Sequence, residues 1–270
     1  MPEGDTVWLT AHRLGKALAG RVVTLFDMRV PALATADLRG QTVAGVLARG
    51  KHLLIRFDDG LTLHSHLRMD GSWYLSAAGS PGPRRHPDHL IRALVGNDDW
   101  VATGYRVHDL HIVSRAREHD LVGHLGPDLL GADWDGALAA DNLASEPGRA
   151  IGEALLDQRH LAGIGNMYKC EVLFIERVHP WTPVGAVPDL LALVTASHRL
   201  LRTNRDHPEQ STTGYTTRGR EHWVYERSGQ PCLRCRATIR RADQGVPPRA
   251  RGTYWCPECQ AEPATPGRSG

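Results

Sequence analysis

Hydrophobic and polar residues alternate through most of the first half of the chain, after one stretch with helical spacing. Over residues 6–19 apolar positions recur at intervals of three and four, and Gly20 follows, which predicts one amphipathic helix. Short alternating or β-branched runs come next, separated by turn signals such as Asp58-Asp59-Gly60. They predict strands over residues 21–26, 41–49, 52–58, 61–66, 72–75, 89–95, 100–105 and 110–114. Short strands at this spacing are typical of an antiparallel β-sandwich.

Helical spacing replaces this alternation near Gly126-Pro127. Helices are predicted over residues 135–144, 149–158, 166–176 and 188–204. Residues 76–87 hold three Pro and two Gly and are expected to form a loop without a regular element. The polar residues 206–220 predict an exposed, flexible loop. The fold class is therefore α+β multidomain, with a sandwich domain and its flanking helix over residues 1–125, a linker over 126–134, a helical domain over 135–220, a finger over 221–260 and a disordered tail over 261–270.

Four of the five cysteines form two CxxC pairs, Cys232/Cys235 and Cys256/Cys259, with 20 residues between them. Four thiolates at this spacing fit one closed, tetrahedral zinc site on a β-hairpin finger. Because no coordination position stays open, the Zn²⁺ ion is expected to be structural. An iron–sulfur cluster and a redox pair remain as alternatives. Cys170, inside an apolar helical run, is expected to be a buried small hydrophobe.

Charge is distributed unevenly along the chain, although the formal net charge is only +2. Residues 199–251 carry twelve Arg against five acidic residues, whereas residues 126–198 carry four basic and ten acidic residues. Arginine binds phosphate oxygens in a forked geometry, so a nucleic-acid partner is indicated. A solvated basic face is the alternative. The six arginines of the finger are expected to face phosphate.

No signal-peptide pattern is visible in the first residues, and no apolar run reaches the roughly 18–20 residues that a membrane span needs. We therefore expect a cytoplasmic protein that is not secreted, that has no membrane partner and that is a monomer. In a bacterium it would be associated with the nucleoid.

The first residues offer an unusual nucleophile. Removal of Met1 would leave Pro2 with a secondary amine at the chain terminus, where amines titrate near pH 7.7–8.0 rather than near the 10.4 of lysine. Such an amine forms an iminium with a carbonyl-like carbon and then acts as an electron sink for elimination. Glu3, the next residue, is placed to act as acid or base.

A glycine turn joins two of the predicted helices. The run Gly163-Ile164-Gly165-Asn166 lets the backbone approach a partner closely, and the amides that start the second helix form an anion site. An αα-corner without a ligand is the alternative. Beside an arginine-rich finger, phosphate binding is favoured.

Five motifs occur in an order that resembles the formamidopyrimidine-DNA glycosylase/endonuclease VIII family of base-excision-repair enzymes. They are Pro2-Glu3-Gly4, Arg49-Gly50-Lys51, His64-Ser65-His66-Leu67-Arg68-Met69-Asp70-Gly71, the Gly163-to-Asn166 turn and the cysteine finger. The resemblance spans nearly the whole chain. It implies a β-sandwich domain and a helix–two-turn–helix domain with a β-hairpin zinc finger, which together clamp damaged double-stranded DNA.

The resemblance also implies the chemistry. Pro2 corresponds to the nucleophile that attacks C1′ of the damaged nucleotide, and Glu3 to the acid/base that assists ring opening. Lys51 corresponds to a lysine that contacts phosphate and is linked to β-elimination. Arg251, five residues before Cys256, corresponds to the finger arginine implicated in DNA binding and δ-elimination.

The remaining matches concern residues that bind DNA. His66 and Asn166 correspond to residues that contact backbone phosphates, and Met69 to the apolar side chain that fills the gap left by the flipped base. Glu171, on the helix after the turn, is expected to support the N-terminus of the chain. Residues 206–220 are a candidate cap over the flipped base.

One departure bears on the substrate. Residues 105–111 lack the Arg-Phe pair that the 8-oxoguanine branch of the family uses, and the opening Met-Pro-Glu-Gly-Asp-Thr-Val resembles endonuclease VIII-type proteins. We therefore expect excision of oxidised pyrimidines, followed by strand nicking at the abasic site through β,δ-elimination. The alternatives are a glycosylase for oxidised purines (formamidopyrimidine or 8-oxoguanine) and a non-catalytic zinc-finger binder of damaged DNA.

Overall fold

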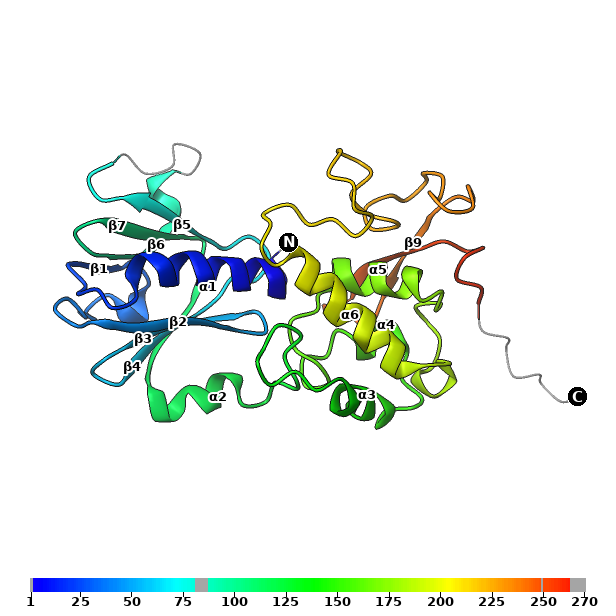
Figure 1. Cartoon of the computed structure of the whole chain (residues 1–270), viewed down its shortest axis with the longest axis horizontal. Coiled ribbons are helices and arrows are strands. Elements are labelled where there is room, and N and C mark those ends of the chain that lie inside the picture. Colours follow the sequence, from blue (N-terminus) through cyan, green and yellow to red (C-terminus); the bar gives the residue numbers. More distant parts are fainter. Residues whose placement is uncertain (1, 81–86, 249, 263–270) are drawn as a thin grey trace, which may run out of the picture. The chain divides into compact units, whose positions relative to one another are not determined.

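The computed structural model describes residues 2–80, 87–248 and 250–262. Contacts divide the chain into two units, Met1–His124 and Leu125–Gly270, called units 1 and 2 (Figure 1). Among the described residues, no helix combines the length and the hydropathy that crossing a bilayer requires.

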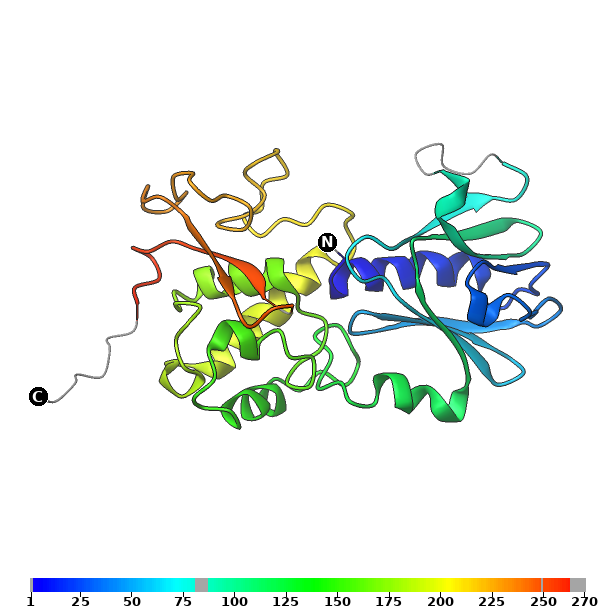
Figure 2. The same cartoon turned by 180° about the vertical axis from the view of Figure 1, so that it is seen from behind.

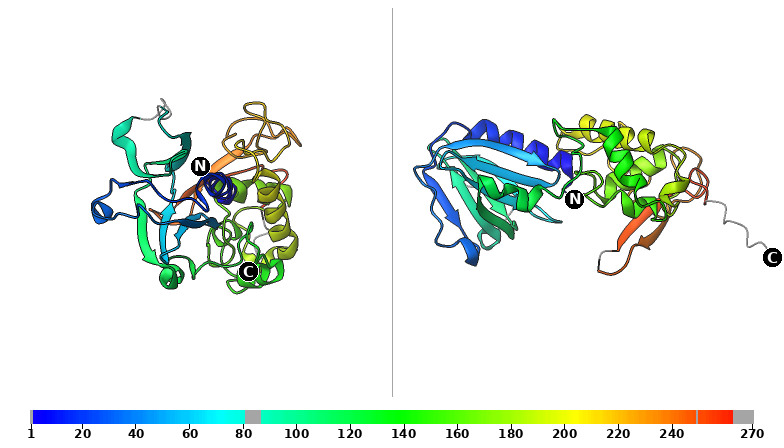
Figure 3. Two further views of the ribbon diagram at one scale, coloured as in Figure 1. Left: turned by 60° about the vertical axis from the view of Figure 1, so that its left-hand side comes forward. Right: turned by 90° about the horizontal axis from the view of Figure 1, so that it is seen from below.

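Two four-stranded antiparallel sheets and one long helix, α1 (Gly4–Leu18), form unit 1. The first sheet has the order β1-β6-β7-β5 and the second β2-β3-β4-β8. The strands are β1 (Leu25–Met28), β2 (Val43–Arg49), β3 (His52–Phe57), β4 (Leu61–His66), β5 (Ser72–Ala77), β6 (Ile91–Gly96), β7 (Trp100–Tyr105) and β8 (Asp109–Ser114). The predicted sandwich with a flanking helix is thus confirmed, and α1 lies along it (Figure 3).

The core of unit 1 follows from strand alternation. On β3, Leu53, Ile55 and Phe57 are fully buried in the hydrophobic core, while His52 and Arg56 point to the opposite, outer face of the sheet. Helix α1 contributes its apolar stripe to the same core, so the sheet and the helix bury one common interior.

Three details of unit 1 differ from the sequence-based predictions. Strand β1 starts only at Leu25, because the preceding residues connect α1 to the sheet through the isolated bridge Val22–Thr42. The loop expected over residues 76–87 begins later, since Ser76 and Ala77 pair with β7; residues 81–86 lie outside the described part. Short helices were missed: η1 (Pro31–Leu33), η2 (Asp88–Leu90), η3 (Arg115–Arg117) and α2 (Glu118–Val122).

Unit 2 packs helices against a two-stranded hairpin. Its elements are α3 (Gly136–Ala144), α4 (Ile151–Ala154), α5 (Asn166–Ile175), η4 (Val184–Ala186), α6 (Leu190–Asn204), β9 (Arg240–Gln244) and β10 (Arg251–Trp255). The β9–β10 hairpin lies beside α5, as Figure 2 shows in orange and red against green. The helix predicted over residues 149–158 is reduced to α4, because residues after Leu155 turn to form the Asp157 side-chain network. Cys170 is fully buried in α5, as predicted.

The segment over residues 206–220 has no regular secondary structure, and most of it is exposed. It is nevertheless anchored, because the fully buried carboxylate of Glu171 accepts hydrogen bonds from the Thr212 hydroxyl and from the backbone amides of Trp223, Val224 and Tyr225. A buried carboxylate with four donors holds Thr212 within this segment, and the residues that follow the segment, against α5. Of the expected disordered tail, residues 261 and 262 are exposed, and residues 263–270 lie outside the described part.

Candidate active site and nucleic-acid interface

The predicted nucleophile and its acid/base stand at the first turn of α1. Pro2 is partly exposed, and Glu3 occupies the N-cap position with its side chain fully buried. The Glu3 carbonyl accepts the backbone N–H of Val7, which is the first bond of the helix. Met1 lies outside the described residues.

The direction of α1 brings this terminus to the Lys51 end of the second sheet. Gly20 N–H donates to the Val43 carbonyl at one end of the pair α1/β2, and a Cβ added at Gly15 would lie 3.8 Å from the Val46 Cβ. The two elements therefore run antiparallel. From that contact α1 extends about 17 Å to Gly4 at 1.5 Å per residue, and β2 with its turn extends about 13 to 17 Å to Lys51. The start of α1 and the end of β2 therefore lie at the same end of unit 1 (Figure 1).

At this end of the second sheet, Lys51 directly precedes β3, and His66 is the last residue of the paired strand β4. Lys51 closes the β2–β3 turn, where Gly50 adopts a φ of +56°, and the next residue, His52, is the Cα partner of His66. The backbone N–H of Arg68 donates to His66 Nδ1 over 3.0 Å, so the ring proton resides on Nε2. Burial lowers the pKa of His66, opposed by Asp109 and reinforced by Lys51 and Arg68. At neutral pH this ring is a neutral Nε2–H donor.

A tight turn after β4 presents Met69 to solvent, with 58% of the residue exposed. The turn is anchored by Leu67, a core residue whose carbonyl accepts the N–H of Gly71. A Cβ at Gly71 would lie 2.5 Å from that carbonyl oxygen, so only glycine fits. Arg68 takes a positive φ of 52° within the same turn. An exposed methionine on a constrained turn has the geometry expected of a wedge.

In unit 2 the predicted phosphate contacts Asn166 and Arg251 come together. Asn166 starts α5 and is 7% exposed; its Nδ2 donates to the Gly252 carbonyl over 2.9 Å, beside Arg251 on β10. Its Oδ1 is buried without a hydrogen-bond partner among the described residues. Gly163, with a φ of 105°, forms the preceding turn. The first turn of α5 is thus joined to the arginine-bearing strand.

A buried lysine joins α5 to the β9–β10 hairpin, and the sequence did not single this residue out. Lys169, with no exposed surface, donates to Thr253 Oγ1 over 2.5 Å, and the Thr253 hydroxyl bonds to Gln244 Oε1 over 3.2 Å. Helix α5 is thereby joined to both strands of the hairpin. A charged side chain in an apolar helical run was the available signal, because such a residue is buried only when it has polar partners.

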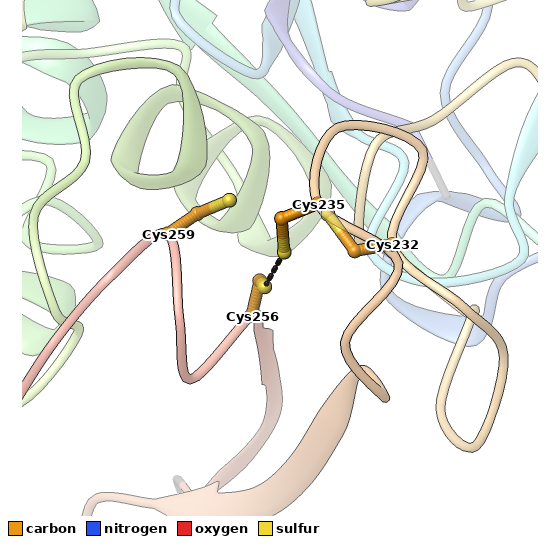
Figure 4. Close-up of side chains that lie close together, drawn as sticks. All are labelled: Cys232, Cys235, Cys256 and Cys259. Atoms are coloured by element: carbon orange, nitrogen blue, oxygen red, sulfur yellow. Dashed lines mark hydrogen bonds between the residues drawn. The ribbon is translucent and has the colours of Figure 1, made fainter.

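The four finger cysteines converge from two loops, as Figure 4 shows. Their sulfur atoms all lie within 4.8 Å of one another, and Cys235 Sγ and Cys256 Sγ are 3.4 Å apart. In a tetrahedron with Zn–S bonds of about 2.3 Å, the sulfur atoms are about 3.8 Å apart. The cluster therefore fits a zinc ion, held by Cys232, Cys235, Cys256 and Cys259.

The finger arginines that the structure describes are all exposed, although two of them also contact other side chains of the protein. The Arg234 guanidinium stacks on Phe174 at 4.4 Å and lies 5.6 Å from Trp223, so it serves packing as a cation–π partner. Arg241 pairs with Asp243 at 2.8 Å. Arg249 is outside the described residues. Arg251 remains exposed, with one hydrogen bond to the neighbouring Ala250 carbonyl.

Four histidines, called here the histidine cluster, occupy the outer face of the second sheet: His52, His64, His66 and His111. His52 Nδ1 and His64 Nε2 are 2.7 Å apart. Burial is the main cause that lowers the pKa of His52 to about 3 and the pKa of His64 to about 4. Both rings are therefore neutral in the folded protein at pH 7.

These depressed pKa values predict acid-sensitive folding. The unfolded chain protonates both histidines below about pH 6.5 while the folded chain does not, so stability is complete above pH 6.5 and is lost as the pH falls toward 4. Each ring contributes roughly 1.4 kcal/mol per pH unit inside that window. Urea unfolding at several pH values should show a shallower loss for His64→Gln than for the wild type, by about that amount. Parallel curves for the two proteins would contradict the buried, neutral state of His64.

Comparison with known proteins agrees with this geometry. The family model described as the formamidopyrimidine-DNA glycosylase N-terminal domain matches residues 1–107, and the one described as its H2TH domain matches residues 125–194. The chain belongs to the formamidopyrimidine-DNA glycosylase family. The family and the enzyme class predicted from the sequence, a DNA glycosylase with AP lyase activity, are thereby confirmed.

Within the family, the chain is similar to endonuclease 8-type proteins. It is 57% identical over 268 residues to a probable endonuclease 8 2 of Streptomyces coelicolor, covering 98% of this chain and 95% of that protein. It is 45% identical over 260 residues to the DNA-(apurinic or apyrimidinic site) lyase Nei2 of Mycolicibacterium smegmatis, covering 96% and 99%. A solved complex of Lactococcus lactis Fpg with abasic-site DNA is 25% identical, with a TM-score of 0.78 over 97% of this chain and 100% of that one.

Proposed function

We propose that this protein excises oxidised pyrimidines from double-stranded DNA through a covalent intermediate on Pro2 and then nicks the strand. The observation that carries the proposal is the antiparallel course of α1 and β2, which brings Pro2 and Glu3 to the sheet end that bears Lys51 and His66. A nucleophile, an acid/base and two phosphate-binding groups at one end of a rigid sandwich are the components that the reaction needs.

The chemistry proceeds from the secondary amine that Met1 removal exposes on Pro2. The Pro2 nitrogen attacks C1′, the glycosidic bond breaks and the base departs with a proton, while Glu3 protonates O4′ as the sugar ring opens. The resulting iminium acidifies the C2′–H bond, and the Glu3 carboxylate, which has given its proton to O4′, accepts the C2′ proton as the 3′ phosphate leaves. In a second elimination a further proton passes to solvent as the 5′ phosphate leaves. Lys51 assists the first elimination and Arg251 the second.

Residues of both units bind the DNA in this proposal. In unit 1, His66 donates from Nε2 to a backbone phosphate, and Met69 fills the gap that the extruded base leaves. In unit 2, Asn166 and Arg251 hold further phosphates at the start of α5 and on β10. The cysteine cluster holds one zinc ion, whose role is to fix the hairpin, because four thiolates leave no position for a substrate.

The pyrimidine preference rests on the absent Arg-Phe pair and on the relatives. Identity is 57% with the Streptomyces coelicolor endonuclease 8 2, but 36% with a formamidopyrimidine-DNA glycosylase of Roseiflexus. We expect thymine glycol, dihydrouracil and 5-hydroxycytosine duplexes to be cleaved at least about tenfold faster than 8-oxoguanine duplexes, a difference of about 1.4 kcal/mol in activation free energy.

A lesion panel under single-turnover conditions measures this preference directly, with an abasic-site duplex as the control for lyase competence. Faster cleavage of 8-oxoguanine would overturn the pyrimidine assignment in favour of the purine glycosylase. Tight, salt-dependent binding without cleavage of any lesion or of the abasic site would contradict the enzyme itself and favour a damaged-DNA binder.

A further inference from the structure

The histidine cluster holds a polar contact that the proposed reaction does not use. His52 Nδ1 and His64 Nε2 form an imidazole–imidazole hydrogen bond of 2.7 Å on the outer face of the second sheet. His64 is 3% exposed, and its Nδ1 has no hydrogen-bond partner among the described residues. If His64 donates from Nε2, its Nδ1 carries a lone pair; if it accepts, Nδ1 carries a buried N–H without a partner. The first arrangement is lower in free energy, because a buried N–H without a hydrogen-bond partner is rarer in proteins than a buried acceptor without one.

This pair is attached to His66 through strand register. His52 is the cross-strand Cα partner of His66, and the two rings meet edge to face with centroids 4.8 Å apart. On the other side of His66 lies Asp109, its Cα partner on β8. Asp109 accepts the Arg68 guanidinium at 3.0 and 3.2 Å, while the Arg68 backbone N–H donates to His66 Nδ1. His66 therefore has neighbours on three sides, and its Nδ1 is occupied by the Arg68 N–H, which leaves Nε2 as the donor.

The same pair is connected to Lys51. His52 directly follows Lys51, so the hydrogen bond from His64 holds the first residue of β3 at the point where the Lys51 turn ends. Burial keeps both rings of the pair neutral at pH 7, so one ring supplies an N–H donor and the other a lone pair.

We infer that His52 and His64 are positioning residues, which orient the His66 ring and the Lys51 turn as one phosphate-binding unit. This inference rests on the proposed function, since it assigns a supporting pair to two proposed phosphate contacts. Neither residue touches the substrate; His64 acts on DNA only through His52 and His66.

A double-mutant cycle on DNA affinity tests the inference. The full-length, zinc-loaded protein is titrated with a duplex that contains a tetrahydrofuran abasic-site analogue. His64→Leu should weaken binding about fivefold, the worth of one ordinary hydrogen bond. His64→Gln, whose amide reaches the position of Nε2, should stay within about twofold of the wild type. In a background that lacks both proposed phosphate contacts, Lys51→Ala with His66→Ala, His64→Leu should add less than about twofold.

The controls separate positioning from folding. His119→Leu makes the same chemical change at a residue whose side chain is 77% exposed and outside the cluster, and should leave affinity unchanged. In the wild type, ¹⁵N chemical shifts should place the His66 proton on Nε2, and His64→Leu should yield a mixture of tautomers.

Two outcomes would overturn the inference in distinguishable ways. An equal loss from His64→Leu in both backgrounds would remove the positioning role and leave the His66 contact intact. Unchanged affinity for His66→Ala alone would remove the proposed phosphate contact and, with it, the role of the pair.

Discussion

Blocking the amine of Pro2 is expected to abolish strand cleavage while DNA binding persists. A short N-terminal extension that prevents exposure of Pro2 converts its nitrogen into an amide, which has no lone pair available for attack on C1′. Because every later step passes through the iminium, cleavage of both lesion and abasic duplexes should fall by on the order of 10³-fold or more. Affinity for the tetrahydrofuran duplex should change only several-fold, since the phosphate contacts lie on other elements.

The matched control is the same extension fused after residue 270, which should leave cleavage at the wild-type rate. Proteolytic removal of the N-terminal extension to leave Pro2 first should restore activity. Full cleavage by the N-terminally extended protein would show that another amine serves as the nucleophile.

Loss of the cysteine cluster is expected to weaken DNA binding strongly. Cys256→Ser replaces a buried ligand of the predicted zinc site, so bound zinc should fall from one ion per chain to none. The β9–β10 hairpin that carries Arg251 should then lose its fixed position. The loss of two or three contacts worth about 1 kcal/mol each predicts roughly 100-fold weaker binding.

Unit 1 should stay folded in this variant, because its core lies within residues 1–124 and contains no part of the finger. Cys170→Ala is the matched control, since Cys170 is equally buried but is not a member of the cluster. Zinc content by mass spectrometry and affinity by fluorescence anisotropy give the two readouts. Wild-type DNA affinity in a zinc-free Cys256→Ser protein would show that the finger takes no part in DNA binding.

Local patterns predicted the elements of this protein well where one face of an element is buried. The apolar stripe of α1 and the alternation along β3 and β4 are visible in the sequence, because helical and strand periods assign each residue to a face. The CxxC spacing predicted the cysteine cluster for a similar reason, since both knuckles are local turns at the ends of one hairpin.

Features that depend on contacts between distant segments escaped prediction. α2 is only five residues long, and its Glu118 is fixed by Arg56 and Thr62, more than fifty residues earlier. The His52–His64 bond depends on the register of β3 against β4, which alternation alone does not specify.

The contacts of the Glu171 carboxylate show the same limit. Sequence predicted a role at the N-terminus for this residue, and that role stays a prediction. Its hydrogen bonds to residues 212–225 come from a segment that has no periodic pattern at all. The tertiary fold determines the hydrogen-bond partners of a buried polar group. The sequence can therefore single out the polar residue but does not predict which residues it contacts.

The most direct test of Pro2 as the nucleophile is to locate the covalent bond between protein and DNA. The protein is incubated with an oxidised-pyrimidine duplex, the intermediate is reduced with borohydride, and the adduct is digested and sequenced by mass spectrometry. The residual deoxyribose mass is expected on the nitrogen of Pro2, in a peptide that lacks Met1. A modified lysine such as Lys51, or an adduct on a chain that retains Met1, would contradict this expectation.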